Sequence, residues 1–513
     1  MLFNSYAFLL FYLPVVLAGF AVAARFGKRA GASWLAVCSL AFYAWWDFRY
    51  LALLLVSIGV NYGLGVQICQ HVGKPRARLI LATGVVLDLG LLAYYKYADF
   101  FIASVDAALG QHWPLLHIVL PIGISFFTFT QIAFLVDAYA GYVAEYRFIN
   151  YVLFVSYFPH LVAGPVLHHK EMMPQFDDDR NYVLRAENFA VGLSIFAMGL
   201  AKKVLIADNL ADGANALFAT EAAPPTLLMA WGGTLAYTFQ LYFDFSGYSD
   251  MAIGLSRLFG VKLPLNFASP YKAVNIQVFW RCWHMTLSRF LRDYLYIPLG
   301  GNRHGTVRRR INLFTTMVLG GLWHGAGWNF AIWGALHGAY LIAHQVWQMV
   351  AASLSLGVPR SLARFVSTGL TFVCVVLAWV FFRAPNLDVA NRVFSGLFAR
   401  NGVALPEALM SRLGALAPWL ERAGIHSFLG GGGMFFSTWQ WVLGAGCVAF
   451  LAPNTQQIMS RFEPALLAPN DPIGGITRWR WQPCRRDAIL LGILLAAGML
   501  ALSRPTEFLY FQF

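Results

Sequence analysis

Charged residues are scarce in this chain: lysine, arginine, aspartate and glutamate make up 12% of its 513 residues. A soluble domain averages about 25% charged residues, so the composition excludes an ordinary soluble protein. Hydrophobic residues reach 59% instead, which indicates an integral membrane protein. The chain also lacks internal repeats and any polar stretch long enough to form a soluble domain.

Cysteine is equally scarce, and its spacing excludes two further classes. The six cysteines are scattered as Cys38, Cys69, Cys282, Cys374, Cys447 and Cys484. None has metal-ligand spacing and several lie inside apolar runs, so neither a disulfide framework nor a zinc site is predicted. The N-terminus lacks the positive charges that precede the apolar core of a signal peptide. Arg25, Lys28 and Arg29 follow the apolar segment instead, which predicts a first span that is retained.

The formal net charge is +13, yet the basic residues do not indicate nucleic-acid binding. They lie mostly in short loops between apolar runs, a pattern that reports membrane topology. Basic loops at 25–29 and 74–78 predict that these connections are cytoplasmic and that the N-terminus lies outside. Basic residues at 478–486 before the last span predict that Phe513 lies outside as well.

Long apolar runs supply the fold class. About 20 apolar residues cross a hydrocarbon core of about 30 Å. Suitable runs lie near 7–24, 31–46, 50–69, 78–95, 115–136, 146–167, 187–206, 225–243, 311–330, 331–350, 364–382, 434–452 and 487–503. Proline and glycine in 146–167 predict a broken or re-entrant segment. We expect an all-α polytopic helical bundle of about 11–13 membrane segments, with interfacial and re-entrant helices.

Two histidines stand in apolar surroundings, His284 after Trp283 and His324 in a glycine-rich stretch. Residues 311–340 contain no charged side chain, and an ionisable group there is a functional hypothesis by default. A neutral imidazole takes up a proton or an acyl group near pH 7. The alternative is a histidine that hydrogen-bonds across the bundle, which we favour for His304, His337 and His344. No metal is predicted, because no second ligand lies three or four residues from His324.

The segment 257–310 is basic and aromatic, as in amphipathic helices that lie in a membrane interface. A helix would place His284, Ser288 and Arg292 on one face. Arg289 and Asp293 would form an ion pair on the adjacent face. This arrangement predicts a site for a phosphate-bearing ligand that arrives from the cytoplasm; a solvated interface helix explains the pattern equally well.

Asp244 and Asp250 lie in an apolar stretch, where carboxylates need partners or protonation. We expect them to pair with the basic segment that follows, and we favour a scaffold role over catalysis. His160 lies between Pro159 and Pro165, which predicts a broken helix that lines a cavity. Its function is open.

With these residues laid out, the chain resembles the membrane-bound O-acyltransferase family, in particular the bacterial branch that acetylates exported polysaccharides such as alginate. The matching stretches are 121–126, 160–165, 202–208, 240–254, 279–302, 320–326 and 381–384. The block 240–326 is highly specific, and the other stretches are individually weak. Cys282 departs from the family pattern, which has an arginine at this position.

The resemblance implies a single domain over 1–513, with N-terminal spans in 1–114, a catalytic core at about 115–350 and C-terminal spans in 351–513. It implies a bundle around a central tunnel, in a bacterial inner membrane, where the basic loops described above place both termini on the periplasmic side. It further implies that His324 is the essential histidine and His284 the second one. Acetyl-CoA would be the donor substrate, with no permanently bound cofactor. The partners would be membrane lipid and a periplasmic acetyltransferase subunit that modifies the polymer.

On this basis we expect side chains from the basic segment to hold the donor: Arg281, Ser288, Arg289, Arg292 and Lys272. We expect tunnel or support roles for Trp323, Asp244, Asp250, His160 and Asp293. His324 would act as a general base or carry the acetyl group itself, and its ring must then be reachable from both sides of the membrane.

The competing class is a polytopic transporter or flippase without acyl-transfer chemistry, but the inverted repeats of that class are not evident. A scaffold for a polymer synthase would not need His324. The sequence chooses neither the polymer nor between a sugar and a protein serine as acceptor.

Overall fold

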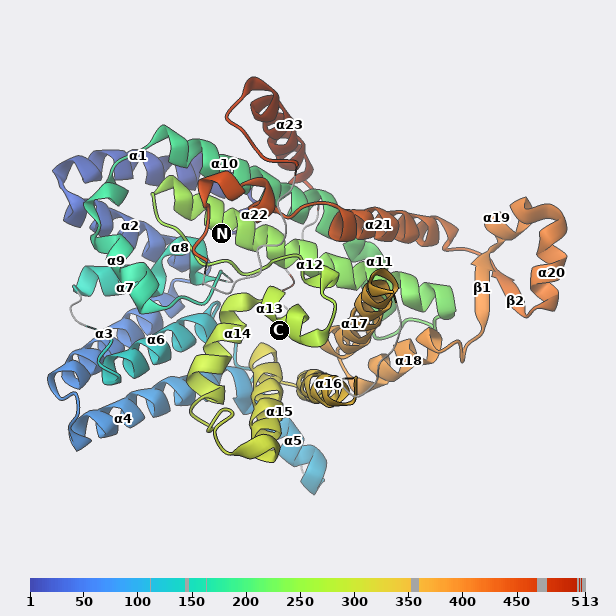
Figure 1. The fold of residues 1–513 in the computed structure, drawn as a ribbon, viewed down its shortest axis with the longest axis horizontal. Helices are drawn as coiled ribbons and strands as arrows, with labels where there is room; N and C mark the ends of the chain where they lie inside the picture. The colour runs from blue at the N-terminus through green and yellow to red at the C-terminus, as the bar shows by residue number, and fades with distance from the viewer. Residues whose placement is uncertain are drawn as a thin grey trace.

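The computed structural model describes residues 1–110, 112–143, 147–162, 164–351, 359–467, 478–504, 507 and 509. Its regular structure is almost entirely helical (Figure 1). The strands in these residues are β1 (Val403–Pro406) and β2 (Ile425–Phe428), which pair in parallel in a small lobe at one end of the molecule. The predicted all-α fold class is confirmed.

Most helices of the N-terminal third form one group, blue to teal in Figure 1, and α5 lies apart from them. Its α-helices are α1 (Leu13–Ala23), α2 (Lys28–Ala44), α3 (Arg49–Gln70), α4 (Pro75–Leu92), α5 (Ala98–Leu109), α6 (Ile124–Tyr139), α7 (Phe148–Ser156), α8 (Phe158–Leu161) and α9 (His169–Asp177). Its π-helices are η1 (Ala7–Tyr12) and η3 (Ala93–Tyr97). The run 146–167 is broken at Tyr157, between α7 and α8, as its prolines predicted. In the run 115–136 the helix begins only at Ile124.

The centre is built on α10 (Ala186–Ala201) and α12 (Leu227–Leu258), which pack side by side and are joined through η5 (Lys202–Ala207) and α11 (Asp208–Phe218). Glycines let the two backbones approach closely. A Cβ atom on Gly199 would lie 2.6 Å from the carbonyl oxygen of Gly247, and one on Gly192 would lie 2.7 Å from that of Gly254. Small residues at such crossings give membrane helices their tightest packing.

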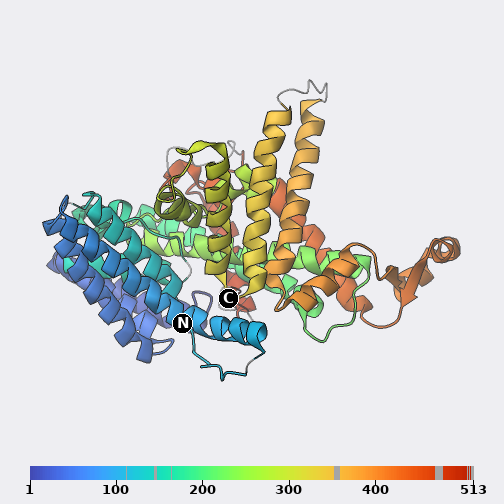
Figure 2. The same ribbon diagram turned by 90° about the horizontal axis from the view of Figure 1, so that it is seen from below.

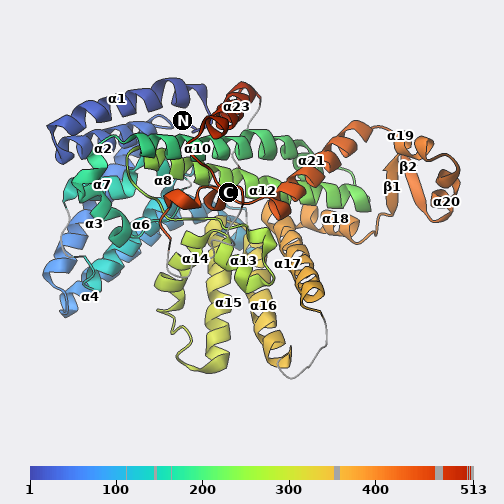
Figure 3. The same cartoon turned by 45° about the horizontal axis from the view of Figure 1, so that its top comes forward.

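The segment with the predicted site residues crosses this centre. It contains α13 (Ile276–Cys282), α14 (Met285–Leu291), η7 (Arg292–Tyr296), α15 (Gly305–His324), α16 (Trp328–Ala351) and α17 (Arg360–Arg383). Helices α15, α16 and α17 run alongside one another (Figure 2). They cross the direction of α10 and α12, and α13 and α14 lie where the two sets meet (Figure 3).

The remaining elements are short or C-terminal. They are α18 (Leu387–Leu397), α19 (Glu407–Met410), α20 (Ala417–Arg422), α21 (Gly432–Leu451), α22 (Thr455–Ile458) and α23 (Arg485–Ala501). Short 3-10 helices are η2 (Ala24–Phe26), η4 (Asp179–Tyr182), η6 (Pro270–Lys272), η8 (Ser411–Leu416) and η9 (Ser460–Phe462).

Six helical stretches of the described residues are long and apolar enough to cross a membrane. They are Ala7–Phe26, Arg49–Gln70, Pro75–Leu109, Ala186–Phe218, Arg360–Arg383 and Gly432–Leu451. They establish a multi-pass membrane architecture, while the larger count of 11–13 segments stays a prediction. The predicted position of Phe513 lies outside the described residues. Leu509, the last described residue, is buried.

Candidate active site

The structure brings His284 and His324 together. Their ring centroids lie 6.2 Å apart, and the two residues are 1% and 8% exposed. Each stands at a break in a helix. His324 is the last residue of α15, since Gly325 is extended (φ −158°, ψ 150°). His284 separates α13 from α14 in the left-handed region (φ 43°, ψ 54°), a conformation that non-glycine residues adopt rarely and mostly at functional sites.

The break at His284 corrects the predicted face. The helix that was expected to carry His284, Ser288 and Arg292 begins only at Met285 and continues as the π-helix η7 from Arg292. His284 is not among the residues that line the cavity formed in part by Ser288 and Arg292. A residue in the left-handed region interrupts a right-handed α-helix. The spacing that placed the three residues on one face assumed an uninterrupted helix.

The histidine pair lies at the junction of two buried apolar clusters. Met285 and Trp323 belong to a cluster built mainly from α1 to α10. Trp283 and Trp333 belong to a second cluster, built from α11, α12 and the helices from α16 to α21. His324 is flanked by Trp323 and Trp333, at centroid distances of 5.0 and 5.3 Å. The two imidazole rings are thus buried among apolar and aromatic side chains.

Asn266 fixes the tautomer of His284. Its Oδ1 accepts hydrogen bonds from the backbone N–H and the Oγ1 of Thr286, at 3.4 and 3.0 Å. A backbone N–H only donates, so the amide oxygen must face this side. The same oxygen lies 3.0 Å from Nδ1 of His284, and Nδ1 therefore carries a proton that it donates. Nε2 keeps its lone pair, and it has no hydrogen-bond partner among the described residues.

A lysine that the sequence analysis did not single out caps the helix that ends at His324. The ammonium of Lys96, in η3, donates to the carbonyl oxygens of Trp323 and His324 at 2.6 and 2.9 Å. The hydroxyl of Tyr97 donates to the carbonyl of Leu322 at 2.8 Å. The available signal was a lysine amid tyrosines in an apolar run, the kind of membrane-buried charge that marks function.

A cavity of about 1070 Å³, hereafter the large cavity, contains most of the predicted donor-binding residues. Arg281, Ser288, Arg289 and Arg292 all line it. Lys272 does not, because its ammonium donates to the carbonyl of Ala452 at 2.6 Å. The prediction missed lining residues from α15 and α16, namely Arg309, Thr316, Met317, His344, Gln345 and Gln348.

The arginines of the large cavity differ in how far they are neutralised. Arg289 makes a two-pronged ion pair with Glu171 at 2.7 and 2.8 Å, and not the predicted pair with Asp293. Asp293 pairs with its neighbour Arg292 instead, at 2.7 and 3.2 Å. Arg281 is exposed and has no carboxylate within 4.0 Å among the described residues. Arg281 is therefore the guanidinium most available to an incoming anion.

A smaller cavity of about 330 Å³, hereafter the small cavity, lies at the other end of α15. It is lined by Tyr95, Lys96, Asp99, Phe100, Ile118, Leu120, Gly325, Ala326 and Phe330. The large cavity reaches Met285, next to His284, and the small cavity reaches Gly325, next to His324. Each cavity thus reaches a residue that is adjacent in sequence to one of the two histidines.

Aromatic side chains lie between the large cavity and His324. Trp280 lines that cavity and contacts Trp333 at a centroid distance of 5.8 Å, and Trp333 in turn packs on His324. Access to the imidazole from both sides of the membrane stays a prediction.

Known proteins resemble this chain over most of its length. Residues 120–360 match the membrane-bound O-acyltransferase family. A peptidoglycan O-acetyltransferase of Helicobacter pylori is 44% identical, over 79% of this chain and 81% of the relative. The chain belongs to the membrane-bound O-acyltransferase family. It is thus a multi-pass membrane O-acyltransferase.

Other relatives of this O-acyltransferase cover different shares of it. A probable alginate O-acetylase AlgI of Pseudomonas putida is 43% identical, over 81% of this chain and 84% of the relative. A teichoic acid D-alanyltransferase of Streptococcus thermophilus is 26% identical, over 44% of this chain and 57% of the relative. The family resemblance predicted from the sequence is confirmed.

The two acidic residues predicted as supports are held by ion pairs in the acyltransferase. Asp244 contacts Lys203 at 2.7 Å, and Asp250 contacts Lys202 at 2.6 Å. The expectation that their partners would come from the basic segment after them is wrong, since both lysines precede them in η5. Asp244 also accepts the backbone N–H of Leu509 at 3.3 Å, which ties the C-terminal segment to α12.

Two other support residues are buried. His160 is 3% exposed, and its Nε2 lies 3.1 Å from the carbonyl of Phe154. It is not among the lining residues of the large or the small cavity, and its cavity-lining role stays a prediction. Trp323 stacks on Phe129, with centroids 5.1 Å apart and an interplanar angle of 18°. Trp323 also contacts both histidine rings, at centroid distances of 6.3 Å to His284 and 5.0 Å to His324.

A polar cluster backs the large cavity. The hydroxyl of Tyr294 donates to Asp137 at 3.0 Å and lies 3.2 Å from Nδ1 of His168, and His169 lies 2.8 Å from Asp137. Burial lowers the pKa of His168 to about 4. This residue is therefore neutral at physiological pH, and the nearby positive charge of Arg289 acts in the same direction.

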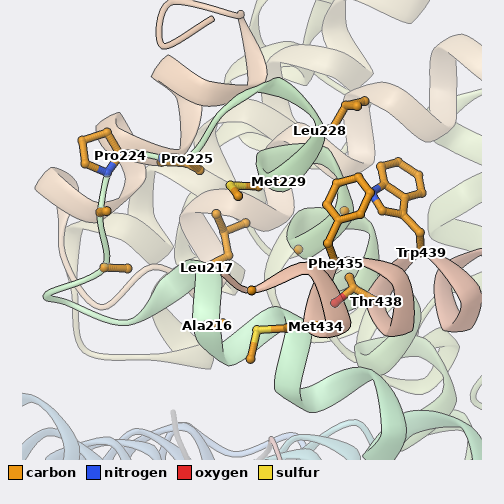
Figure 4. A pocket seen from close by; sticks show the side chains of 16 residues that line it. Ala216, Leu217, Pro224, Pro225, Leu228, Met229, Met434, Phe435, Thr438 and Trp439 are labelled. Carbon is orange, nitrogen blue, oxygen red and sulfur yellow. The ribbon is translucent and has the colours of Figure 1, made fainter. Parts of the chain in front are cut away.

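Figure 4 shows a further cavity of about 250 Å³, which is lined by residues from 213–233 and 431–439. It is lined mostly by apolar side chains from α11, α12 and α21, among them Leu217, Met229, Met434, Phe435 and Trp439. It contains none of the predicted site residues. Likewise, the described residues contain no group of three or more potential metal ligands.

Proposed function

We propose that this O-acyltransferase moves acetyl groups from cytoplasmic acetyl-CoA across the inner membrane for O-acetylation of an exported polysaccharide. The final transfer would run through a periplasmic acetyltransferase partner. The observation that carries the proposal is the histidine pair between two cavities at opposite ends of α15. The names of its relatives, which include O-acetylases of alginate and of peptidoglycan, support the acetyl group as cargo.

The donor would occupy the large cavity. Arg308, Arg309 and Arg310 lie near the beginning of α15, and short basic segments favour the cytoplasmic side. The large cavity would then open to the cytoplasm and the small cavity to the periplasm, with both termini periplasmic. Arg281 would bind a CoA phosphate through charge-assisted hydrogen bonds, and Ser288 and Arg292 would add contacts on the same wall.

In the transfer step, an acceptor hydroxyl would arrive through the small cavity. His324 would remove the proton of this hydroxyl while its oxygen attacks the thioester carbonyl carbon. The carbon–sulfur bond then breaks, and the thiolate of CoA takes up the proton from the imidazolium. His284, whose Nε2 has a free lone pair, would accept a hydrogen bond from the amide N–H that precedes the thioester in the CoA arm and so orient the thioester next to His324. In the alternative route, the imidazole of His324 carries the acetyl group between donor and acceptor.

The test measures CoA release from labelled acetyl-CoA in membrane vesicles, with and without the periplasmic partner. His324→Ala at normal expression should abolish release, while His71→Ala, at the C-terminal end of α3, should leave it unchanged. A transporter, the competing class, would take up label without releasing CoA. Release of one equivalent of CoA without acceptor would identify the covalent route. Full activity of His324→Ala would refute the proposal.

A further inference from the structure

The capping of α15 by η3 is the strongest unexplained feature near the histidines. The last carbonyl groups of a helix have no intrahelical donor, and an unsatisfied carbonyl is costly inside a membrane protein. Lys96 and Tyr97 supply donors to the final turn, at the carbonyls of Leu322, Trp323 and His324. The turn that carries the essential imidazole is therefore held from outside its own helix.

The use of a lysine for this task needs its own reason. A charged side chain is expensive in a membrane protein and is usually paired, yet Lys96 has no carboxylate within 4.0 Å among the described residues. Asp99, on the same cavity wall, accepts the backbone N–H groups of Leu116 and Ile118 at 2.7 and 3.1 Å. Neutral side chains also donate to such carbonyls, as the hydroxyl of Tyr97 does to Leu322, so the charge of Lys96 calls for a role beyond capping.

The position of the charge relates it to the reaction. A cation at a helix C-terminus is stabilised by the helix dipole, and the ammonium also lies 5.9 Å from the ring centroid of Trp323. The ammonium of Lys96 contacts the backbone carbonyls of His324, which carries the imidazole, and of Trp323, the residue before it. In addition, η3 is a π-helix, an irregularity that is frequent at functional sites.

We propose that Lys96 is a positioning residue for acyl transfer. Its ammonium fixes the terminal turn of α15, so that the ring of His324 faces His284, and it keeps a positive charge beside the base. The other ionisable groups that surround His324 are His284 and His337, and Asp99 lines the small cavity together with Lys96. This inference rests on the proposed function, because it assigns a role within that reaction.

Three substitutions of Lys96 separate its contributions. Lys96→Arg keeps the charge and the donors, Lys96→Gln keeps a donor without charge, and Lys96→Met removes both. Tyr97→Phe is the matched control, because it removes a neighbouring hydrogen bond to the same turn and leaves the charge in place. Each variant is compared for yield of folded protein and thermal stability before its kinetics are measured.

We expect Lys96→Met to lower kcat about 100-fold, the effect of misplacing a reacting group by about 1 Å. KM for acetyl-CoA should change little, because the large cavity lies at the other end of α15. In both Lys96→Gln and Lys96→Met, the acid limb of the pH profile of kcat should move to higher pH, since loss of the nearby cation makes protonation of the base easier. Lys96→Arg and Tyr97→Phe should keep the wild-type profile.

A folded Lys96→Met variant with wild-type kcat would overturn the proposal. So would a lower kcat in Lys96→Gln and Lys96→Met with an acid limb at the wild-type pH, since this is the result of a purely structural role. If Lys96→Met does not fold, the pH profile of Lys96→Gln decides. Absence of CoA release from the wild-type protein would instead refute the proposed function, so the two failures are distinguishable.

Discussion

The hydrogen bonds around Asn266 make a quantitative prediction about catalysis. Asn266 is fully buried, and its Oδ1 accepts the Nδ1 proton of His284 as well as the hydroxyl and the backbone N–H of Thr286. Asn266→Ala removes the acceptor and leaves the buried Nδ1–H without a partner. The imidazole is then free to rotate or to adopt its other tautomer, which has no lone pair on Nε2.

The size of the effect follows from the cost of a buried polar group without a partner, about 1–3 kcal/mol. Applied to the transition state, this cost lowers kcat by about 5- to 150-fold, since 1.4 kcal/mol corresponds to a factor of ten. KM for acetyl-CoA should change little, because Asn266 does not line the large cavity. The measurement is the initial rate of CoA release in vesicles, with thermal unfolding of the same preparation.

Thr286→Val is the matched control. It removes a hydroxyl that bonds Asn266 and that also accepts the backbone N–H of Val166 at 3.0 Å, but it leaves the bond between Asn266 and His284 in place. It should therefore lower thermal stability more than kcat, and Asn266→Ala should do the reverse. If folded Asn266→Ala retains more than half of the wild-type kcat, the assignment of the His284 tautomer to catalysis is wrong.

Three further predictions address the donor site, the helix packing and the polar cluster. Arg281→Gln should raise KM for acetyl-CoA about 10- to 100-fold, because a hydrogen bond to a charged group is lost. Arg289→Gln should mainly lower the melting temperature, because its carboxylate partner is left unpaired. Equal KM values in both variants would contradict this prediction. Gly199→Val should abolish folded protein in size-exclusion chromatography, because its side chain meets the backbone of α12, whereas Gly59→Val, with open space at its Cβ, should not. Burial lowers the pKa of His168 from 6.5 to about 4, so its contribution to stability is present above pH 6.5 and is lost as the pH falls toward 4. His168→Gln should therefore reduce the pH dependence of the melting temperature over this range. An unchanged pH dependence would exclude His168 as its source.

Some of the site could be read from residue types alone. The lack of charge and the long apolar runs determined the membrane class, because a helix in hydrocarbon must be apolar over about 20 residues. His284 and His324 stood out since ionisable groups are rare in such surroundings. The arginines after His284 were recognised by their clustering, and Arg281, Arg289 and Arg292 do share one cavity wall.

Tertiary structure decided which charges meet. Arg289 forms an ion pair with Glu171 and not with Asp293, and Asp244 forms one with Lys203 and not with the basic segment. Glu171 and Lys203 are distant in the sequence from the residues that they pair with, so the spacing of neighbouring residues cannot predict these ion pairs. Inside a medium of low dielectric constant, the geometry of the fold selects which pair forms.

Tertiary structure also decided the shape of the site. The left-handed turn at His284 and the end of α15 at His324 bring the two rings together, although a regular helix was expected through the first of them. Lys96 became visible only because folding places η3 against the final turn of α15. The sequence by itself determined the membrane class and the chemical groups available for acyl transfer. Their mutual orientation depended on backbone breaks and long-range caps, which are stabilised by contacts between distant segments.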